Sequence, residues 1–127
     1  MLSKYQIPAI IWALIILILT LTPGEHLPSL QLGKIMIDKF LHFMVFMVLS
    51  FLAIAGLQAD NNSNTNGLWR KMLGICMGYG ILMETLQYVV PGRHIDLFDL
   101  VANLVGCGAG MWLFIGYQKV VRSLAKK

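Results

Sequence analysis

Two groups of ionisable and amide side chains occur where this sequence is otherwise apolar. Glu84 and Gln87 lie three residues apart inside one hydrophobic segment, and a polar run that begins at Arg93 leads straight into the next. A charged side chain costs about 2.5–3.5 kcal/mol at the centre of a helix in hydrocarbon, so such residues usually have partners and a function. The residues that we predict to bind a ligand are Lys39, His42, Glu84, Gln87, Arg93, Asp96, Asp99 and Asn103.

These residue types allow acid–base chemistry as well as binding. His42 or Glu84 is a candidate general base, Asp99 could orient it, and Arg93 could stabilise a phosphate or another anion. Asp38 precedes His42 by one helical turn, so its carboxylate could hold the tautomer of the imidazole, although a single histidine is more often a structural interface residue. One histidine and several carboxylates could also hold a divalent cation. Their spacing matches no metal motif, however, and we expect neither a metal ion nor a cofactor.

The chain that positions these groups has the composition of a membrane protein. Its 127 residues are 57% hydrophobic and 13% charged, whereas about a quarter of the residues in a soluble domain are charged. Four apolar segments approach the ~20 residues that span a bilayer; they are residues 7–21, 40–57, 72–90 and 97–117. We therefore predict a single all-α transmembrane domain over residues 1–127. The expected four-helix bundle has helices at about 5–22, 37–58, 71–90 and 96–118.

Three parts of the chain need a separate interpretation. The first apolar segment, preceded by Lys4, could be a signal peptide, but no small-x-small cleavage site follows it, so we expect a retained helix. The stretch from Gln58 to Gly67 is low in complexity, and we expect a surface loop there. Cys76 and Cys107 lie in apolar segments, at depths that we expect to differ, and are therefore interpreted as packing residues without a disulfide.

The distribution of basic residues predicts the orientation in the membrane. With four crossings, one side holds Lys4, Arg70, Lys71, Lys119, Arg122, Lys126 and Lys127, and the other holds Lys34, Lys39 and Arg93. The positive-inside rule then places both termini in the cytoplasm and the polar residues beneath the opposite face. The net charge of +4 comes mainly from these flanking residues. Attraction to anionic lipids explains them, so we expect no nucleic-acid partner.

The third and fourth segments are joined by a short linker of turn-forming residues, 91–95. A short linker favours antiparallel neighbours, and we predict a tight helical hairpin. Folding the chain around this linker brings Glu84 level with Asn103, whose amide could donate to the carboxylate.

The fourth segment carries a stripe of polar residues and glycines at intervals of three and four, which places them on one helix face. Its members are Asp96, Asp99, Asn103, Gly106 and Gly110. We predict that this stripe faces other helices and not lipid. Gly106-x-x-x-Gly110, and Gly74-x-x-x-Gly78 in the third segment, would permit close approach of neighbouring helices.

Most of the polar residues also have a structural interpretation. Asp96 and Asp99 suit the start of a helix as a cap and as charges at the positive end of its dipole. Arg93 could pair with Asp96 or with a lipid phosphate, and Lys39 could simply extend toward the membrane interface. Glu84 is the hardest to explain in this way, because serine or glutamine would supply a structural hydrogen bond at a lower cost.

The same residues resemble the VanZ-like family of small membrane proteins. The matching patterns are Asp38-Lys39-x-x-His42, Glu84-x-x-Gln87 and Pro91-x-Arg93-x-x-Asp96-x-x-Asp99-x-x-x-Asn103-x-x-Gly106-x-x-x-Gly110. Thr20-Leu-Thr22-Pro23 at the end of the first segment fits as well. The founding member of the family accompanies glycopeptide-resistance clusters and lowers susceptibility to teicoplanin. The resemblance therefore implies a protein of the bacterial cytoplasmic membrane, although a resistance phenotype does not transfer with family membership alone.

Three hypotheses about function remain open. The first is a binding or accessory protein of the cell envelope, whose polar site takes a lipid-linked head group or a lipoglycopeptide-type amphiphile. In it Lys39 and Arg93 would hold anionic groups. Hydrogen bonds to sugar or amide groups would come from Glu84, Gln87, Asp99 and Asn103. The second is an intramembrane hydrolase or transferase acting on an envelope lipid with the same cluster. A transporter is the third, and it would need an oligomer because four helices make a thin scaffold.

Overall fold

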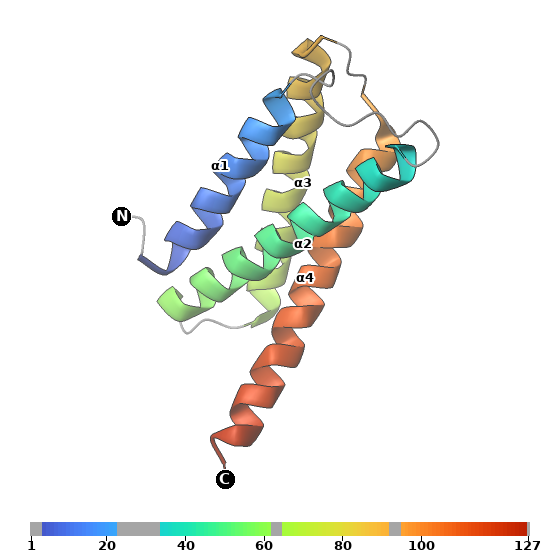
Figure 1. The fold of residues 1–127 in the computed structure, drawn as a ribbon. Helices are drawn as coiled ribbons and strands as arrows, with labels where there is room; N and C mark the ends of the chain where they lie inside the picture. The colour runs from blue at the N-terminus through green and yellow to red at the C-terminus, as the bar shows by residue number, and fades with distance from the viewer. Residues whose placement is uncertain (1–3, 23–33, 62–64, 92–94, 127) are drawn as a thin grey trace.

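The computed structural model describes residues 4–22, 34–61, 65–91 and 95–126. These residues form a 3₁₀ turn η1 (Lys4–Gln6) and four α-helices (Figure 1), and they contain no strand. The helices are α1 (Ile7–Leu21), α2 (Lys34–Asn61), α3 (Thr65–Val89) and α4 (Leu97–Leu124). They alternate in direction, so the start of α1, the end of α2, the start of α3 and the end of α4 lie toward the same end of the molecule. The all-α prediction is confirmed, whereas the side of the membrane on which the termini lie stays a prediction.

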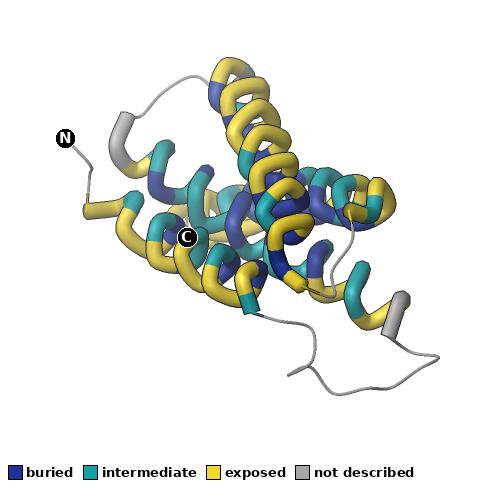
Figure 2. The backbone as a smooth tube through the Cα atoms, turned by 90° about the horizontal axis from the view of Figure 1, so that it is seen from above, coloured by how far each residue is buried: buried dark blue, intermediate teal, exposed yellow. Residues whose placement is uncertain are grey.

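Three helical stretches are long and apolar enough to cross a membrane within the described part of the chain. They are Lys4–Leu21, Met36–Ala59 and Leu97–Leu124. The outward faces of these helices carry exposed isoleucine, leucine and phenylalanine, and Figure 2 shows that buried residues gather where the helices meet. The prediction of four crossing helices is thus supported for α1, α2 and α4. The third helix is less apolar, because Glu84 and Gln87 interrupt its hydrophobic residues.

Helices α2, α3 and α4 begin before or end after the apolar segments that predicted them, whereas α1 coincides with residues 7–21. Residues at both ends of the expected loop Gln58–Gly67 are helical, since α2 ends at Asn61 and α3 begins at Thr65. The end of α4 projects beyond the other helices (Figure 1) and reaches Leu124. Arg122 lies in its last turn, where a cation is favoured by the helix dipole. The length of an apolar segment reflects the thickness of the hydrocarbon layer. A helix can extend beyond that segment, because its backbone hydrogen bonds do not depend on apolar side chains.

The tightest packing joins α4 to α2 and not to α3. A Cβ atom on Gly106 would lie 2.2 Å from the carbonyl oxygen of Phe43, and one on Gly110 would lie 2.1 Å from that of Met47. These glycines therefore permit close approach, as predicted, but their partner is α2. The tight hairpin of the third and fourth helices is not confirmed, because a short linker fixes which helices follow one another and not which ones pack most closely.

The second glycine pair does not pack against a neighbouring helix. A Cβ atom on Gly74 or on Gly78 would meet nothing within 4 Å, and both residues are exposed. The prediction that this pair mediates close approach within the chain is wrong. The spacing of two small residues indicates a smooth helix face, but a partner has to lie opposite that face.

Candidate functional site

Seven polar side chains from three helices converge near the start of α4. Five of them are buried: His42 from α2, Glu84 and Gln87 from α3, and Asp99 and Asn103 from α4. Lys39 and Asp96 lie at the edge of this group and are partly exposed. We call these seven residues, together with Asp38, the polar cluster. The structure thus brings together the predicted site residues, with the exception of Arg93, which lies outside the described residues together with His26 and His94.

The start of α4 is built around Asp96. Its side chain accepts a hydrogen bond of 2.8 Å from the backbone amide of Phe98, and its backbone is extended, as in a helix N-cap. The Lys39 ammonium and the Phe98 amide hold the pKa of Asp96 below its ordinary value. Asp96 therefore has the structural role that the sequence allowed for it, and Asp99 enters the cluster from the first turn of the same helix.

Lys39 is engaged by two carboxylates. Its Nζ atom lies 2.5 Å from Asp96 Oδ2 and 2.9 Å from Asp99 Oδ1, and it also lies over the ring of Phe98. An ammonium group with two anionic partners has little capacity left for a further anion. The expectation that Lys39 holds an anionic ligand group therefore loses support, and the lysine instead links α2 to α4.

The imidazole of His42, on α2, lies between α3 and α4. Its Nδ1 atom lies 3.1 Å from the side-chain oxygen of Asn103 and 4.0 Å from Glu84 Oε1, whereas Nε2 lies 3.9 Å from Asp99 Oδ2. An amide oxygen only accepts hydrogen bonds, so Nδ1 carries the proton and a neutral ring has its lone pair on Nε2. Asn103, and not Asp38, thus fixes the tautomer.

Glu84 is a buried carboxylate that accepts no hydrogen bond from the part of the chain that the structure describes. It is 4% exposed, and neither of its oxygen atoms has a hydrogen-bond partner among the described residues. The backbone amide of Asp96 is close enough to interact with it electrostatically but does not meet hydrogen-bond geometry. The predicted bond from the Asn103 amide is absent: that Nδ2 atom also lacks a partner among these residues. Asn103 instead turns its oxygen toward His42, one turn above the close approach at Gly106.

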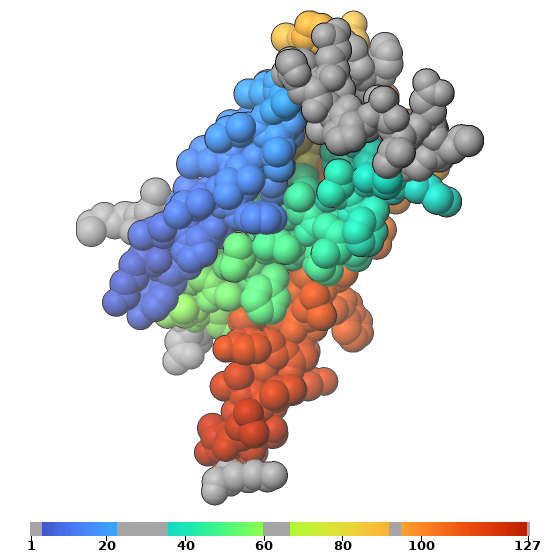
Figure 3. Space-filling model, viewed as in Figure 1, coloured from blue at the N-terminus to red at the C-terminus, as the bar shows by residue number. Residues whose placement is uncertain are grey.

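A cavity of about 150 Å³ opens beside the polar cluster, between α1, α2 and α3. We call it the apolar groove. Its polar lining is Thr20, Thr22, Asp38, His42 and Gln87, and its apolar lining is Ile16, Leu19, Leu41, Val45, Phe46 and Met83. Figure 3 shows α1 lying along α2 on this side of the molecule.

Sequence reasoning missed the contribution of α1 to this groove. Two hydrogen bonds join α1 to α2 and α3. The Trp12 indole donates to the backbone carbonyl of Val45 over 2.9 Å, and the Tyr79 hydroxyl donates to the backbone carbonyl of Ala13 over 2.5 Å. Thr20, a buried polar residue in an otherwise apolar helix, was the available signal. A uniformly apolar segment does not show which of its faces meets protein.

The two cysteines lie away from the polar cluster and against each other. Cys76 and Cys107 are both buried and both free, and their thiols interact directly. The expectation that the two cysteines lie at different depths in the membrane is therefore wrong. Helices α3 and α4 pack in a different register from the one predicted by folding the chain around residues 91–95. A Cβ atom on Gly80 of α3 would lie 3.6 Å from Asn103 Nδ2, so this part of α3 lies beside Asn103.

Comparison with known proteins gives two matches and one absence. The model of the VanZ/LLP1 family matches residues 6–121. A curated protein of the fission yeast Schizosaccharomyces pombe, itself described as uncharacterised, is 35% identical over 82 residues, which is 65% of this chain and 49% of the yeast protein. The chain thus spans about half the length of this relative. No solved structure matches.

Proposed function

Because this chain belongs to the VanZ/LLP1 family, we propose that it is a membrane protein that binds a membrane lipid. The head group of the lipid enters the polar cluster, and its hydrocarbon lies in the apolar groove. One observation carries the proposal: the lining of the apolar groove includes the buried polar side chains of His42 and Gln87. Sites for amphiphiles combine a mostly apolar wall with a few polar groups that fix orientation.

The charges of the cluster favour a particular kind of head group. Lys39 is already engaged by Asp96 and Asp99, so the groups that remain are mainly acceptors. The two oxygen atoms of Glu84 have no partner within the described part of the chain, and Gln87 is buried at the groove. Hydroxyl or amine donors of a head group would satisfy these acceptors, whereas a bare anion would be repelled.

The yeast relative favours a general membrane lipid. Because that relative occurs in a eukaryote, a lipid of eukaryotic membranes explains it better than a glycopeptide antibiotic or a bacterial wall precursor does. In a bacterium the protein would lie in the cytoplasmic membrane. The charge distribution of the loops would then expose the site toward the extracytoplasmic leaflet.

Filling the apolar groove tests this proposal. Leu41 lines the groove from a half-exposed position on α2, so a tryptophan there blocks the groove without disturbing the buried core. We expect Leu41→Trp to reduce the fraction of protein that carries a co-purified lipid about fivefold, because the hydrocarbon loses its contacts. Native mass spectrometry of the detergent-extracted protein measures that fraction and identifies the lipid by mass.

Phe40, the residue before Leu41, provides a matched control. It is also exposed on α2 but does not line the groove. Phe40→Trp therefore places the same indole ring outside the groove and should leave lipid occupancy unchanged. Equal thermal stability of the two variants in detergent shows that both are folded. Undiminished lipid occupancy in Leu41→Trp would refute the proposal.

An intramembrane hydrolase or transferase is the second candidate function. The observation in its favour is the unbonded carboxylate of Glu84, 4.0 Å from the imidazole of His42, since a general base needs an acceptor free to take a proton. If the cluster is catalytic, purified protein incubated with radiolabelled membrane lipids will form a new product. The Glu84→Gln variant will lose about 100-fold in rate while still binding lipid. No product from either protein, with equal lipid binding, would exclude catalysis on those lipids.

A further inference from the structure

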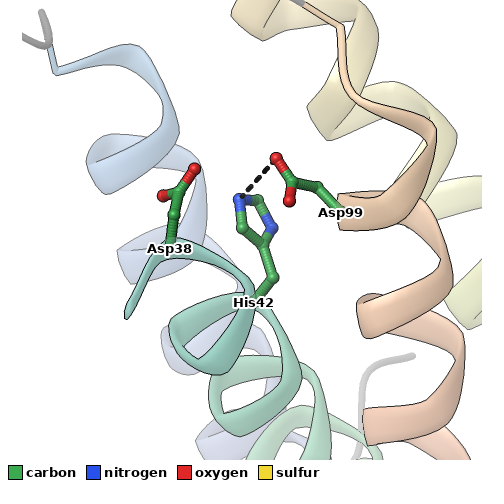
Figure 4. Close-up of side chains that lie close together, drawn as sticks. All are labelled: Asp38, His42 and Asp99. Carbon is green, nitrogen blue, oxygen red and sulfur yellow. Dashed lines mark ion pairs between the residues drawn. The ribbon is translucent and has the colours of Figure 1, made fainter. Parts of the chain in front are cut away.

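We propose that Asp38, His42 and Asp99 form a binding site for one divalent transition-metal ion. Each residue offers one ligand atom, and these three atoms lie within 4.8 Å of one another. Figure 4 shows the imidazole between the two carboxylates, with Asp38 on α2 and Asp99 on α4 on either side of it. Asp38 and His42 are four residues apart on one helix face, so two separate elements form the site.

The tautomer of His42 prepares its Nε2 atom for a metal ion. The side-chain oxygen of Asn103 accepts a hydrogen bond from Nδ1–H, so a neutral ring has its lone pair on Nε2, the nitrogen that faces Asp99. An oxygen acceptor behind a ligand histidine is the usual arrangement at metal sites, where it fixes the ring and raises its basicity. Lys39 occupies Asp99 Oδ1, while Oδ2 faces Nε2. With a neutral ring, Nε2 and Oδ2 are two acceptors that face each other, and a metal ion between them would bind both.

A second, independent observation also indicates a cation. Glu84 is buried, its oxygen atoms lack hydrogen bonds among the described residues, and it faces the same imidazole from the Nδ1 side at 4.0 Å. Glu84 apart, the polar cluster holds three carboxylates, those of Asp38, Asp96 and Asp99, against the ammonium of Lys39. In a membrane this excess of negative charge is costly, and a divalent cation would offset it.

The ligand set selects the kind of ion. One imidazole nitrogen and two carboxylate oxygens suit Mn²⁺, Fe²⁺ or Zn²⁺, whereas Mg²⁺ and Ca²⁺ prefer oxygen alone. Ligand atoms about 2.1 Å from one ion lie about 3–3.5 Å apart, so the 3.9 Å between Nε2 and Asp99 Oδ2 closes with a small side-chain rotation. Three protein ligands leave coordination positions for water or for an oxygen of a head group.

Titration with Mn²⁺ tests the site. The full-length protein is purified in detergent, treated with a chelator and titrated with MnCl₂ while electron paramagnetic resonance measures free and bound Mn²⁺. We expect one bound ion per chain and a nitrogen coupling from the imidazole in the pulsed spectrum. The His42→Gln variant should lose the nitrogen coupling, and both His42→Gln and Asp38→Asn should weaken binding at least about tenfold.

Asp96→Asn is the matched control. It removes the same charge from the same cluster, and asparagine still caps α4, but Asp96 is not one of the three ligands. It should change Mn²⁺ affinity by less than about threefold. Asp38 is partly exposed in the first turns of α2, so Asp38→Asn remains informative if His42→Gln does not fold.

Three results would overturn the proposal: no stoichiometric binding, wild-type binding without nitrogen coupling, or equal affinity of Asp38→Asn and Asp96→Asn for Mn²⁺. The titration uses neither lipid nor a groove variant. A negative result here therefore leaves the proposed lipid binding intact, and loss of the lipid proposal leaves this site intact.

Discussion

Gly106→Ala will destabilise the protein by about 3 kcal/mol, because the added methyl group has no room between α4 and α2. Its Cβ atom would lie 2.2 Å from the Phe43 carbonyl oxygen and 3.0 Å from the carbonyl carbon. Both atoms belong to backbone, which cannot rotate away as the tip of a side chain can, so the two helices have to separate. Titration with sodium dodecyl sulfate in mixed micelles, followed by loss of helical circular dichroism, measures the change.

The same substitution two residues further along α4 is the control. A Cβ atom on Gly108 would meet nothing within 4 Å, so Gly108→Ala should leave stability unchanged or raise it slightly. Gly106→Ala should also disturb the polar cluster, because Asn103 lies one turn away and bonds His42 across the same interface. Equal stability of the two alanine variants would show that α2 and α4 do not approach as closely as described.

The helices and the buried face of α4 were predictable from the sequence. Hydropathy and the spacing of polar residues are properties of a single helix. Hydropathy predicted the positions of α2 and α4, and the spacing indicated that the polar stripe of α4 faces protein. Asp99, Asn103, Gly106 and Gly110 are all buried, as the spacing of three and four predicted. The cost of polar groups in hydrocarbon also indicated that Glu84 and His42 would be gathered inside the bundle, and both are buried.

Pairing between helices could not be predicted in the same way. Asn103 was expected beside Glu84 and bonds His42 instead, because α2 and not α3 lies against the glycine face of α4. A sequence pattern defines which residues share a face, but two helices of similar composition compete for that face. The contribution of α1 to the groove was missed for the same reason. Ile16 and Leu19 line the groove, but their residue types are the same as those of the lipid-facing residues around them.

The cluster also differs from the expected anion site in its charge. Lys39 and Arg93 were predicted to hold anions. Lys39 instead forms ion pairs with Asp96 and Asp99, and Arg93 lies outside the described residues. Counting charges along the sequence gives the total but not the pairs. Once the pairs are formed, what remains around His42 is an excess of acceptors, and both the head-group proposal and the metal proposal follow from that excess.

Lys39→Leu should be the second strongly destabilising change, at about 2–3 kcal/mol. It leaves Asp99 buried without its cation, and breaking a fully buried ion pair costs about 3–5 kcal/mol. The lower figure applies here because the side chain of Lys39 is 29% exposed and exposed pairs contribute about 1 kcal/mol or less. The same detergent titration measures the effect. Lys71→Leu, at an exposed position on α3, controls for the loss of a lysine and should have little effect.

The double variant separates the ion pair from the packing of the lysine chain. If the cost of Lys39→Leu comes from the unpaired charge of Asp99, then Asp99→Asn in the same protein removes that charge and should restore more than half of the lost stability. If the cost comes from the lost contact of the lysine ammonium with the ring of Phe98, the second substitution will restore nothing. Wild-type stability of Lys39→Leu alone would mean that Asp99 has another counter-charge. In that case a cation at the three-ligand site would be the group that holds α2 and α4 together.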